Sequence, residues 1–353
     1  MRDEGLDTTE IIVDRKTDEN NVAPRTAQYI AINDRKKDLL LAMADMKILA
    51  NQLSLNQTKT MLKTRLQTPD LKWAVIDANW NSFDIRLFMS HYTESFLHTE
   101  KEPVRVAFEP VSTAKCAAIF DCKPSDTLAL KPFPFNTINL VTPNQHELAA
   151  LYESAKRHGY FHTDEWWRCI DSLGIPSSGA RDRFINITNR EMVDEGIPIQ
   201  TIQLLPFMPT ILTKLGKDGV LLTELLKPED PRLTDPDHAQ WILARCTNGS
   251  EEVGGVYMRL FPAVETVMNE DVVSVNGVGD TFLGVLVAGL ARGLDLDDNL
   301  INVAQRGAVM TLKSKRSVCP DVSNLRVVLD DLAKKKFENL PIRRLKTKHG
   351  VGY

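Results

Sequence analysis

Apolar and polar positions fall in short blocks along most of the chain. Some blocks have the two-residue period of a strand, and others have the 3.6-residue period of a helix. Near the N-terminus, "TAQYIAIND" is rich in β-branched and aromatic residues and ends in an Asn-Asp turn, which predicts a strand. The following "KKDLLLAMADM" predicts a second strand, so the two would form a hairpin with one apolar face. The run "KWAVIDAN", from Lys72, predicts a buried parallel strand, and "FDIRLFMSHYTESFLHT" has helical spacing.

The exchange of strand and helix patterns continues toward the C-terminus. "VRVAFEPVS" predicts a strand, and "TINLVTPNQHELAALYESA" passes from strand to loop to helix. "PTILTKLGKDGVLLTEL" predicts two strands joined by a Gly-Lys-Asp-Gly turn. "DTFLGVLVAGLARG" predicts a helix that stops near Gly293, and "NLINVAQRGAVMTLKS" predicts another. This alternation predicts an α/β fold whose mostly parallel sheet is covered on both faces and binds ligands at the carboxyl ends of its strands.

Shifts in composition divide the chain into four stretches. Residues 1–25 are polar and irregular, and residues 26–46 hold the predicted hairpin. Residues 47–335 form the predicted core, in which about 151–205 is an insertion rich in charge and aromatic residues, with a helix or two. Residues 336–353 form a basic tail, which is either solvated or a phosphate-binding patch.

Composition and charge exclude several classes of function. The 353 residues are 43% hydrophobic and 25% charged, with a net charge of −4, so nothing favours a nucleic-acid partner. No apolar run approaches the ~18 residues that a membrane span needs. The N-terminal "MRDEGLDTTE" is acidic and polar, unlike a signal peptide, and the five scattered cysteines form no CxxC pair. We therefore predict a cytoplasmic protein with reduced thiols.

The stretch "SVNGVGDTFLG" carries the clearest chemistry. Gly277 and Gly279 remove Cβ atoms where the backbone must turn and approach a ligand, and a helix begins near Asp280. The free N–H groups and the positive dipole of such a helix start favour an anion, usually phosphate. Asp280 then either caps the helix or takes a proton from a hydroxyl that attacks the phosphate. The spacing of a Walker A loop is absent.

Several motifs together resemble the PfkB (ribokinase-like) carbohydrate kinases. "NGVGDTF" is similar to the family signature D-T-x-G-A-G-D, with Ser274 in place of its first Asp and Val278 in place of Ala. Asn144 and Glu147 in "TPNQHEL" resemble its N-x-x-E motif, and "LTKLGKDGVLL" resembles the strand-turn-strand that borders the nucleotide. The segments "VIDAN" and "EPVSTAK" resemble sheet-end segments of the nucleoside-kinase branch, at Asp77, Asn79 and Lys115. All these matches follow the family's order across residues 26–320.

Within the family, "TAQYIAIND", "EPVSTAKC" and "NGVGDTFLG" are most similar to eukaryotic pseudouridine kinases, which are often fused to a pseudouridine-5′-phosphate glycosidase. The resemblance implies a ribokinase-like three-layer α/β/α sandwich with a mostly parallel sheet and a partial β lid. It implies phosphoryl transfer from ATP, with Mg²⁺ and an optional monovalent cation, to a sugar or nucleoside, for which pseudouridine is the preferred prediction. A homodimer and a functional link to the glycosidase are further expectations.

The resemblance also assigns roles to single residues, each beside a structural alternative. Asp280 would be the catalytic base, and the N–H groups of Gly277, Val278 and Gly279 would form the anion hole. Asn144 and Glu147 would position magnesium through water, or would serve only the start of their helix. The nucleotide residues, which could equally be turn or surface residues, would be Lys115, Lys214, Gly216 and Gly219. The substrate residues, which could equally be strand-packing residues, would be Thr26, Tyr29 and Asp45.

The chain departs from the family at its start. A full member opens with strands, a G-G-x-x-x-N segment and a helix, whereas "MRDEGLDTTE" resembles the segment that follows them. Three explanations stay open: a truncated gene model or splice form, an edge covered by a partner or second copy, or a catalytically inactive remnant. The alternatives to a pseudouridine kinase are accordingly a non-catalytic binding protein and a ribokinase-like enzyme for a free sugar.

Overall fold

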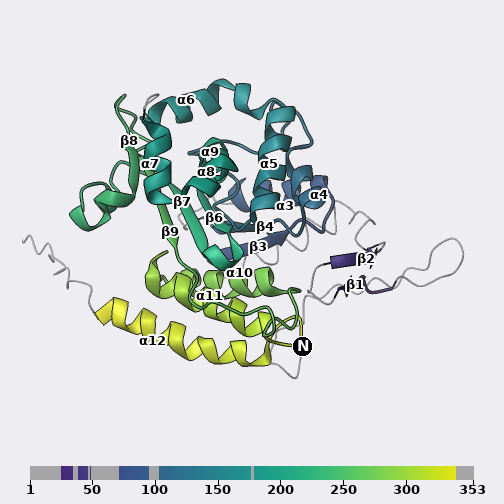
Figure 1. Ribbon diagram of the computed structural model, residues 1–353. Coiled ribbons are helices and arrows are strands. Elements are labelled where there is room, and N and C mark those ends of the chain that lie inside the picture. The colour runs from purple at the N-terminus through teal and green to yellow at the C-terminus, as the bar shows by residue number, and fades with distance from the viewer. Residues whose placement is uncertain are drawn as a thin grey trace, which may run out of the picture. The chain divides into compact units, whose positions relative to one another are not determined.

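A computed structural model describes residues 25–34, 39–46, 48, 71–94, 103–175 and 179–338 of the chain (Figure 1). The predictions for residues 1–24 and for most of the basic tail lie outside these residues. The chain divides into two compact units. The first comprises Met1–Thr213 and Leu221–Arg259, and the second comprises Lys214–Val220 and Leu260–Tyr353. The predicted domain boundaries stay predictions.

Nine described strands form two sheets. They are β1 (Gln28–Asn33), β2 (Leu39–Asp45), β3 (Trp73–Asp77), β4 (Arg105–Glu109), β5 (Leu140–Val141), β6 (Thr210–Lys214), β7 (Val220–Leu226), β8 (Ile242–Arg245) and β9 (Gly255–Phe261). The larger sheet has the order β3-β4-β5-β6-β7-β9-β8. Strands β3 to β6 pair in parallel, and β8 pairs antiparallel with β9. This arrangement confirms the predicted α/β class with a mostly parallel sheet.

The smaller sheet is the hairpin of β1 and β2. The two strands pair antiparallel, with Gln28 opposite Asp45 and Tyr29 opposite Ala44. Side chains alternate between the faces of a strand, and directly opposite residues share a face. Tyr29 and Asp45 therefore project from opposite faces of the hairpin. Tyr29 is 52% exposed, so plain strand packing does not account for its side chain within the described residues.

Strand β3 differs from its prediction in one respect. It is parallel, as expected, but it stands at one end of the described strand order and has β4 as its single described neighbour. Ile76 is buried, whereas Val75 is 52% exposed. The strand is therefore less buried than predicted, because an apolar run cannot reveal how many neighbours a strand will have.

The described helices of the first unit lie between and after its strands. They are α3 (Ser82–Glu94), α4 (Thr113–Ala117), α5 (Gln145–Arg157), α6 (Asp164–Ser172), α7 (Ala180–Ile187), α8 (Arg190–Asp194) and α9 (Ile197–Leu204), with the 3₁₀ turns η2 (Ala118–Phe120), η3 (Tyr160–His162), η5 (Pro231–Leu233) and η6 (Pro236–Trp241). In Figure 1, α5, α8 and α9 gather on one side of the strands of this unit, where α9 packs on both α5 and α8. Three mutually edge-on rings, Phe120, Tyr160 and Phe207, fill the core beneath α5.

The interval 151–205 is more helical than the predicted helix or two. It holds the end of α5 and four further α-helices, α6 to α9. Helices α6 to α9 are short, between five and nine residues; α6 and α8 begin at a capping side chain, and α7 and α9 begin after a glycine. Caps and single turns leave little 3.6-residue periodicity, so the sequence pattern underestimated them.

The second unit is mainly helical. Its described elements are η4 (Gly216–Asp218), α10 (Val278–Ala291), α11 (Asp298–Leu312), η7 (Pro320–Asn324) and α12 (Leu325–Glu338). Helix α10 packs against α11, and both contact α12. The core-facing side chains of α10 include Phe282, Leu283 and Leu286, all nearly inaccessible to solvent. This packing fixes the N-terminus of α10, on which the "NGVGDTF" motif lies.

Candidate active site

The carboxyl ends of three parallel strands meet in the first unit. The register places Asp77 of β3 beside Glu109 of β4, and Phe108 beside Val141 of β5. The Ala78 amide donates a hydrogen bond to the Glu109 carbonyl at 3.0 Å, which keeps the two strand ends together. The polar segments after these strands therefore share the edge where α/β sheets bind ligands.

Lys115 reaches across this edge. It lies in α4, which begins after the capping side chain of Ser112. Its ammonium donates a 2.6 Å hydrogen bond to Asn79 Oδ1, and the Asn79 amide donates to Asp77 Oδ1 at 2.9 Å. The structure thus brings together three residues that the resemblance placed at the sheet ends. Lys115 is half-buried and held by a partner, so it is not a freely solvated surface lysine.

The corner between β4 and α4 is strained. Val111 has φ +64°, a left-handed conformation that a β-branched residue rarely adopts. Such strain persists only where the surroundings enforce it, and it is common at functional sites. Here it turns the chain within the segment "EPVS", so that α4 starts directly beside the end of β4.

Asn144 and Glu147 form a complete capping box at the start of α5. Asn144 Oδ1 accepts from the amides of His146 and Glu147, both at 2.9 Å, and Glu147 Oε2 accepts from the Asn144 amide at 2.8 Å. Three backbone N–H groups at the start of α5 are satisfied in this way. Glu147 is 5% exposed, and no described residue donates a hydrogen bond to its other oxygen, Oε1. Asn144 and Glu147 therefore do cap the helix, and Glu147 Oε1 remains for a second role.

A second buried carboxylate, Glu109, was missed by the sequence analysis. It is 6% exposed at the end of β4, and its Oε2 accepts a hydrogen bond from Thr142 Oγ1 at 3.1 Å. Burial, together with the charges of Glu147 and Glu109, raises the pKa of the nearby Cys116 thiol to about 12. Both carboxylates thus lie close to one thiol, which stays neutral. The available signal was an acid at the last position of a strand, in "FEP".

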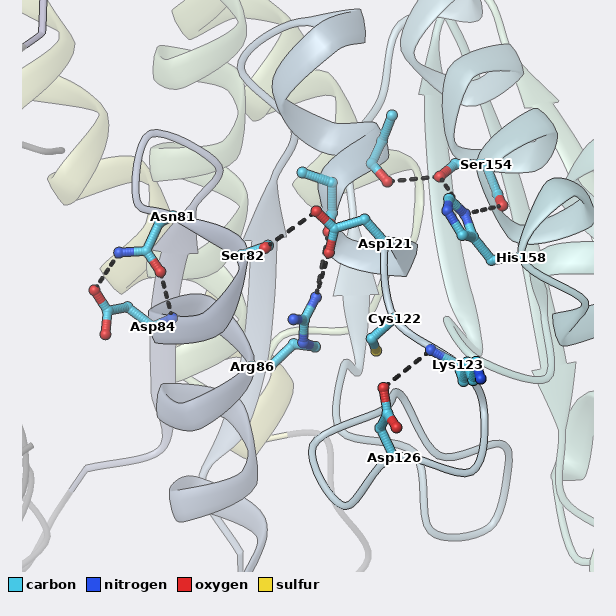
Figure 2. A network of polar contacts seen from close by, with 12 residues as sticks. Asn81, Ser82, Asp84, Arg86, Asp121, Cys122, Lys123, Asp126, Ser154 and His158 are labelled. Carbon is cyan, nitrogen blue, oxygen red and sulfur yellow. Dashed lines mark hydrogen bonds and ion pairs between the residues drawn. The ribbon is translucent and has the colours of Figure 1, made fainter. Parts of the chain in front are cut away.

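Polar contacts hold α4 against its neighbours (Figure 2). Ser154 of α5 donates a 2.7 Å hydrogen bond to the carbonyl of Ala117 at the end of α4. Beyond η2, Asp121 accepts from Arg86 at 2.8 Å and from Ser82 at 3.2 Å, both on α3. The segment that carries Lys115 is therefore tied to the helices on both sides of it.

The N-terminus of α10 in the second unit is uncapped. Gly277 is the N-cap, with φ +76°, and no side chain makes a capping hydrogen bond. The first intrahelical bond runs from the Thr281 amide to the Gly277 carbonyl at 2.9 Å. Within the described chain, the amides of Gly277, Val278 and Gly279 have no acceptor. These three groups were predicted to form an anion hole, and a helix start with open N–H groups can hold an anion.

Both glycines of this turn have close neighbours in the same unit. A Cβ atom on Gly277 would lie 1.7 Å from the Ser317 carbonyl oxygen, in addition to the strain of its positive φ. A Cβ atom on Gly279 would lie 2.9 Å from Lys214 Nζ. The Lys214 ammonium therefore lies over the first turn of α10, where it adds positive charge to the open N–H groups.

Asp280 is the third residue of α10, and its side chain is exposed. Among the described residues none is hydrogen-bonded to its carboxylate. The alternative in which Asp280 caps the helix is therefore not supported. An exposed carboxylate without a described partner, at a helix start with open N–H groups, has the chemistry of a proton acceptor.

Gly216 and Gly219 shape the turn between β6 and β7. Both have positive φ, and the Leu215 amide donates to the Gly219 carbonyl at 2.8 Å. A Cβ atom on Gly219 would lie 2.1 Å from the Phe261 carbonyl oxygen, so the turn is pressed against the end of β9. The turn accounts for both glycines, and their contact with a nucleotide stays a prediction.

The predicted substrate residues Thr26, Tyr29 and Asp45 are all exposed on or beside the hairpin. Because Tyr29 and Asp45 lie on opposite faces of it, they do not form one cluster. No group of three or more His, Cys, Asp or Glu residues in the described chain could hold a metal ion. Magnesium needs only one or two protein carboxylates beside substrate phosphates, so a site of the Glu147 kind would not form such a group.

Comparisons with known proteins give one sequence relative. The chain is 31% identical over 303 residues to a pseudouridine-metabolizing bifunctional protein, C1861.05, of Schizosaccharomyces pombe. The matched residues cover 85% of this chain. The chain spans 35% of that relative's length. No protein-family model matches the chain. The sequence match confirms the predicted relationship to a eukaryotic pseudouridine-metabolizing protein.

Solved structures with a similar arrangement include sugar kinases. Ribokinase of Cryptococcus neoformans in complex with ADP is 13% identical, with a TM-score of 0.46, over 87% of this chain and 71% of that chain. Ribokinase of Arabidopsis thaliana with ribose and ATP is 12% identical, with a TM-score of 0.45, over 88% and 69%. Phosphofructokinase-2 of Escherichia coli with potassium is 12% identical, with a TM-score of 0.42, over 79% and 63%. In the part of the chain that the structure describes, no helix has both the length and the apolar character to cross a membrane.

Proposed function

We propose that this chain, a relative of a pseudouridine-metabolizing protein, transfers the γ-phosphoryl group of ATP to a primary hydroxyl of a sugar or nucleoside, with pseudouridine as the acceptor. The observation that carries the proposal is the start of α10. It combines open N–H groups, the Lys214 ammonium over Gly279 and an exposed carboxylate without a described partner. The name of the relative supports pseudouridine over other acceptors.

In the proposed reaction Asp280 accepts the proton of the attacking hydroxyl as its oxygen bonds to the γ-phosphorus. The bond from that phosphorus to the β,γ-bridging oxygen breaks, and ADP leaves with the electron pair. Negative charge gathers on the equatorial oxygens of the transferring group. The amides of Gly277, Val278 and Gly279, with the nearby Lys214 ammonium, would stabilise that charge.

The first unit, taken by itself, carries groups that fit a phosphate and a magnesium ion. Lys115 would hold a phosphate oxygen, exchanging its bond to Asn79 for one to the substrate. Glu147 fits a magnesium site, because its buried carboxylate keeps one oxygen outside the capping box. Bound magnesium would neutralise part of the charge on the ATP phosphates. Glu109, buried beside Thr142, adds negative charge at the same strand ends.

The test is ADP release by the purified chain with magnesium-ATP and four acceptors: pseudouridine, uridine, ribose and adenosine. The proposal expects release with pseudouridine that disappears in Asp280→Asn. The matched control is Asp298→Asn, which removes an exposed acid from the first turn of α11 instead. Release with ribose but not with pseudouridine would identify a free-sugar kinase. Nucleotide binding without release from any acceptor would identify a non-catalytic binding protein and overturn the proposal.

A further inference from the structure

A row of buried hydroxyl groups ends at the glycine turn of α10, and neither the motifs nor the proposed function accounts for it. Thr281 follows Asp280 in α10, and Thr311 lies near the end of α11. Thr281 is 4% exposed and Thr311 is 0% exposed. Their hydroxyl oxygens are 2.9 Å apart, although the residues are thirty positions apart in the sequence. Most buried hydroxyls are hydrogen-bonded, and each has one proton to donate.

The direction of every hydrogen bond in the row follows from counting protons. Thr281 Oγ1 donates its single proton to the Gly277 carbonyl at 2.8 Å. At the contact between the two threonines, Thr311 must therefore be the donor. Thr311 Oγ1 in turn accepts the backbone N–H of Cys319 at 3.1 Å. The result is an ordered chain from Cys319 N–H through Thr311 and Thr281 to the Gly277 carbonyl, and such chains strengthen cooperatively.

The chain of hydrogen bonds ends on a peptide unit of the proposed anion hole. The Gly277 carbonyl and the Val278 N–H belong to one planar trans peptide, so they point in opposite directions. The carbonyl accepts from both the Thr281 hydroxyl and the Thr281 amide, at 2.8 and 2.9 Å, which uses both of its lone pairs. Holding this carbonyl toward the helix interior therefore holds the Val278 N–H outward, away from the helix.

The segment after α11 braces the same turn from its other side. The Leu312 carbonyl accepts from the amides of Val273 and Ser274 at 2.9 and 3.2 Å. The Ser317 carbonyl oxygen lies 1.7 Å from the place of a Cβ on Gly277. The glycine turn is thus held between its own helix and residues 312–319, and Thr311 is the side chain that links the two.

We infer that Thr311 is a positioning residue, which fixes the direction of the Val278 N–H through the hydroxyl of Thr281. The expected effect of Thr311 on kcat rests on the proposed function. Its expected effect on the conformation of the glycine turn rests on the hydrogen bonds alone. Thr311 touches no reacting atom, so its loss should lower kcat without weakening substrate binding in proportion.

The test compares Thr311→Val, which replaces the hydroxyl by a methyl group of similar size, with Thr311→Ser, which keeps it. The matched control is Thr137→Val, since Thr137 is also buried but its hydroxyl has no described partner. We expect kcat to fall about tenfold in Thr311→Val, with the KM for each substrate within about twofold of wild type. Thr311→Ser should recover most of kcat, and Thr137→Val should retain it.

Amide hydrogen exchange gives a readout that needs no activity. The N–H groups of Thr281 and Cys319, which donate to the Gly277 carbonyl and to Thr311 Oγ1, should exchange faster in Thr311→Val and at the wild-type rate in Thr311→Ser. An unchanged exchange rate and unchanged kcat in Thr311→Val would overturn the inference, as would equal losses in Thr311→Ser, which would point to packing. If the wild-type chain has no kinase activity, the proposed function fails, and the exchange rates alone decide whether Thr311 holds the turn.

Discussion

Helices α5 and α10 both carry an acid at their third position, and they use it in opposite ways. In α5 the acid is Glu147, which closes a capping box with Asn144 and is buried. In α10 the acid is Asp280, which is exposed and follows a glycine N-cap without a capping side chain. The first helix satisfies its own backbone, and the second leaves its N–H groups open. An acid near a helix start therefore indicates function only when the structure has no use for it.

The largest expected effect is a loss of kcat when Asp280, the exposed acid of α10, is replaced. Asp280→Asn should lower kcat by about 10²-fold or more, because the proposed general base is lost. The melting temperature should stay within about a degree of wild type, since the carboxylate has no described partner and a charge at an exposed helix start contributes only tenths of a kcal/mol. Steady-state kinetics and thermal unfolding of the same preparation check both parts. Near-wild-type kcat would contradict the role of Asp280.

The open turn should tolerate a side chain poorly at its first glycine. Gly277→Ala places a Cβ 1.7 Å from the Ser317 carbonyl oxygen at a φ of +76°. We expect the free energy of unfolding to fall by on the order of 2 kcal/mol or more, because the contacting atoms of Ser317 belong to the backbone and cannot move aside. Urea unfolding measures this loss. Gly284→Ala in the same helix, where a Cβ meets nothing within 4 Å, is the control and should be neutral or slightly stabilising.

The capped helix should lose stability at its cap. Asn144→Ala removes the acceptor for the amides of His146 and Glu147, so the free energy of unfolding should fall by about 1 kcal/mol. Chemical denaturation measures the change. Asn144→Asp keeps an acceptor at the same place and should restore most of the stability. If Asn144→Ala leaves stability unchanged, the capping box does not contribute to the fold.

The smallest expected effect is a pH dependence beside α5. Burial and the charges of Glu147 and Glu109 raise the pKa of the Cys116 thiol from its ordinary 9.0 to about 12. The folded state therefore favours the neutral thiol, and the resulting stability is complete below pH 9 and is lost as the pH rises toward 12. Cys116→Ala should make the decline of unfolding free energy over this range shallower than in wild type. Parallel slopes in the two proteins would contradict the burial of this thiol.

Local sequence patterns predicted most of the elements that position the candidate site. The strand-loop-helix around Pro143 and the glycine turn before α10 follow from periodicity and turn residues, which act over a few neighbouring positions. Glu109 was missed because its burial depends on pairing with β3 and on the Thr142 hydroxyl, 33 residues away. The partial exposure of β3, at one end of the described strand order, was not predicted from its own apolar run, since neighbour number is a tertiary property.

Residue roles were harder to predict than elements. The sequence could not separate capping from catalysis at Asp280 or at Glu147, because both roles need a carboxylate at the same helical position. Only the hydrogen-bond partners separate them. The hydroxyl row through Thr311 left no sequence signal, because threonine inside a helix is common and its partner in α10 is fixed by packing of the two helices.

The capping box of α5 also bears on how this chain can change during evolution. A descendant that lost catalysis would still need Asn144 and Glu147 to start α5, so purifying selection on folding alone would preserve the N-x-x-E letters. Nothing in the described structure would preserve Asp280 in such a descendant. A genome search that relies on N-x-x-E would therefore collect inactive paralogues, whereas the acid of G-x-G-D would be among the first letters to drift.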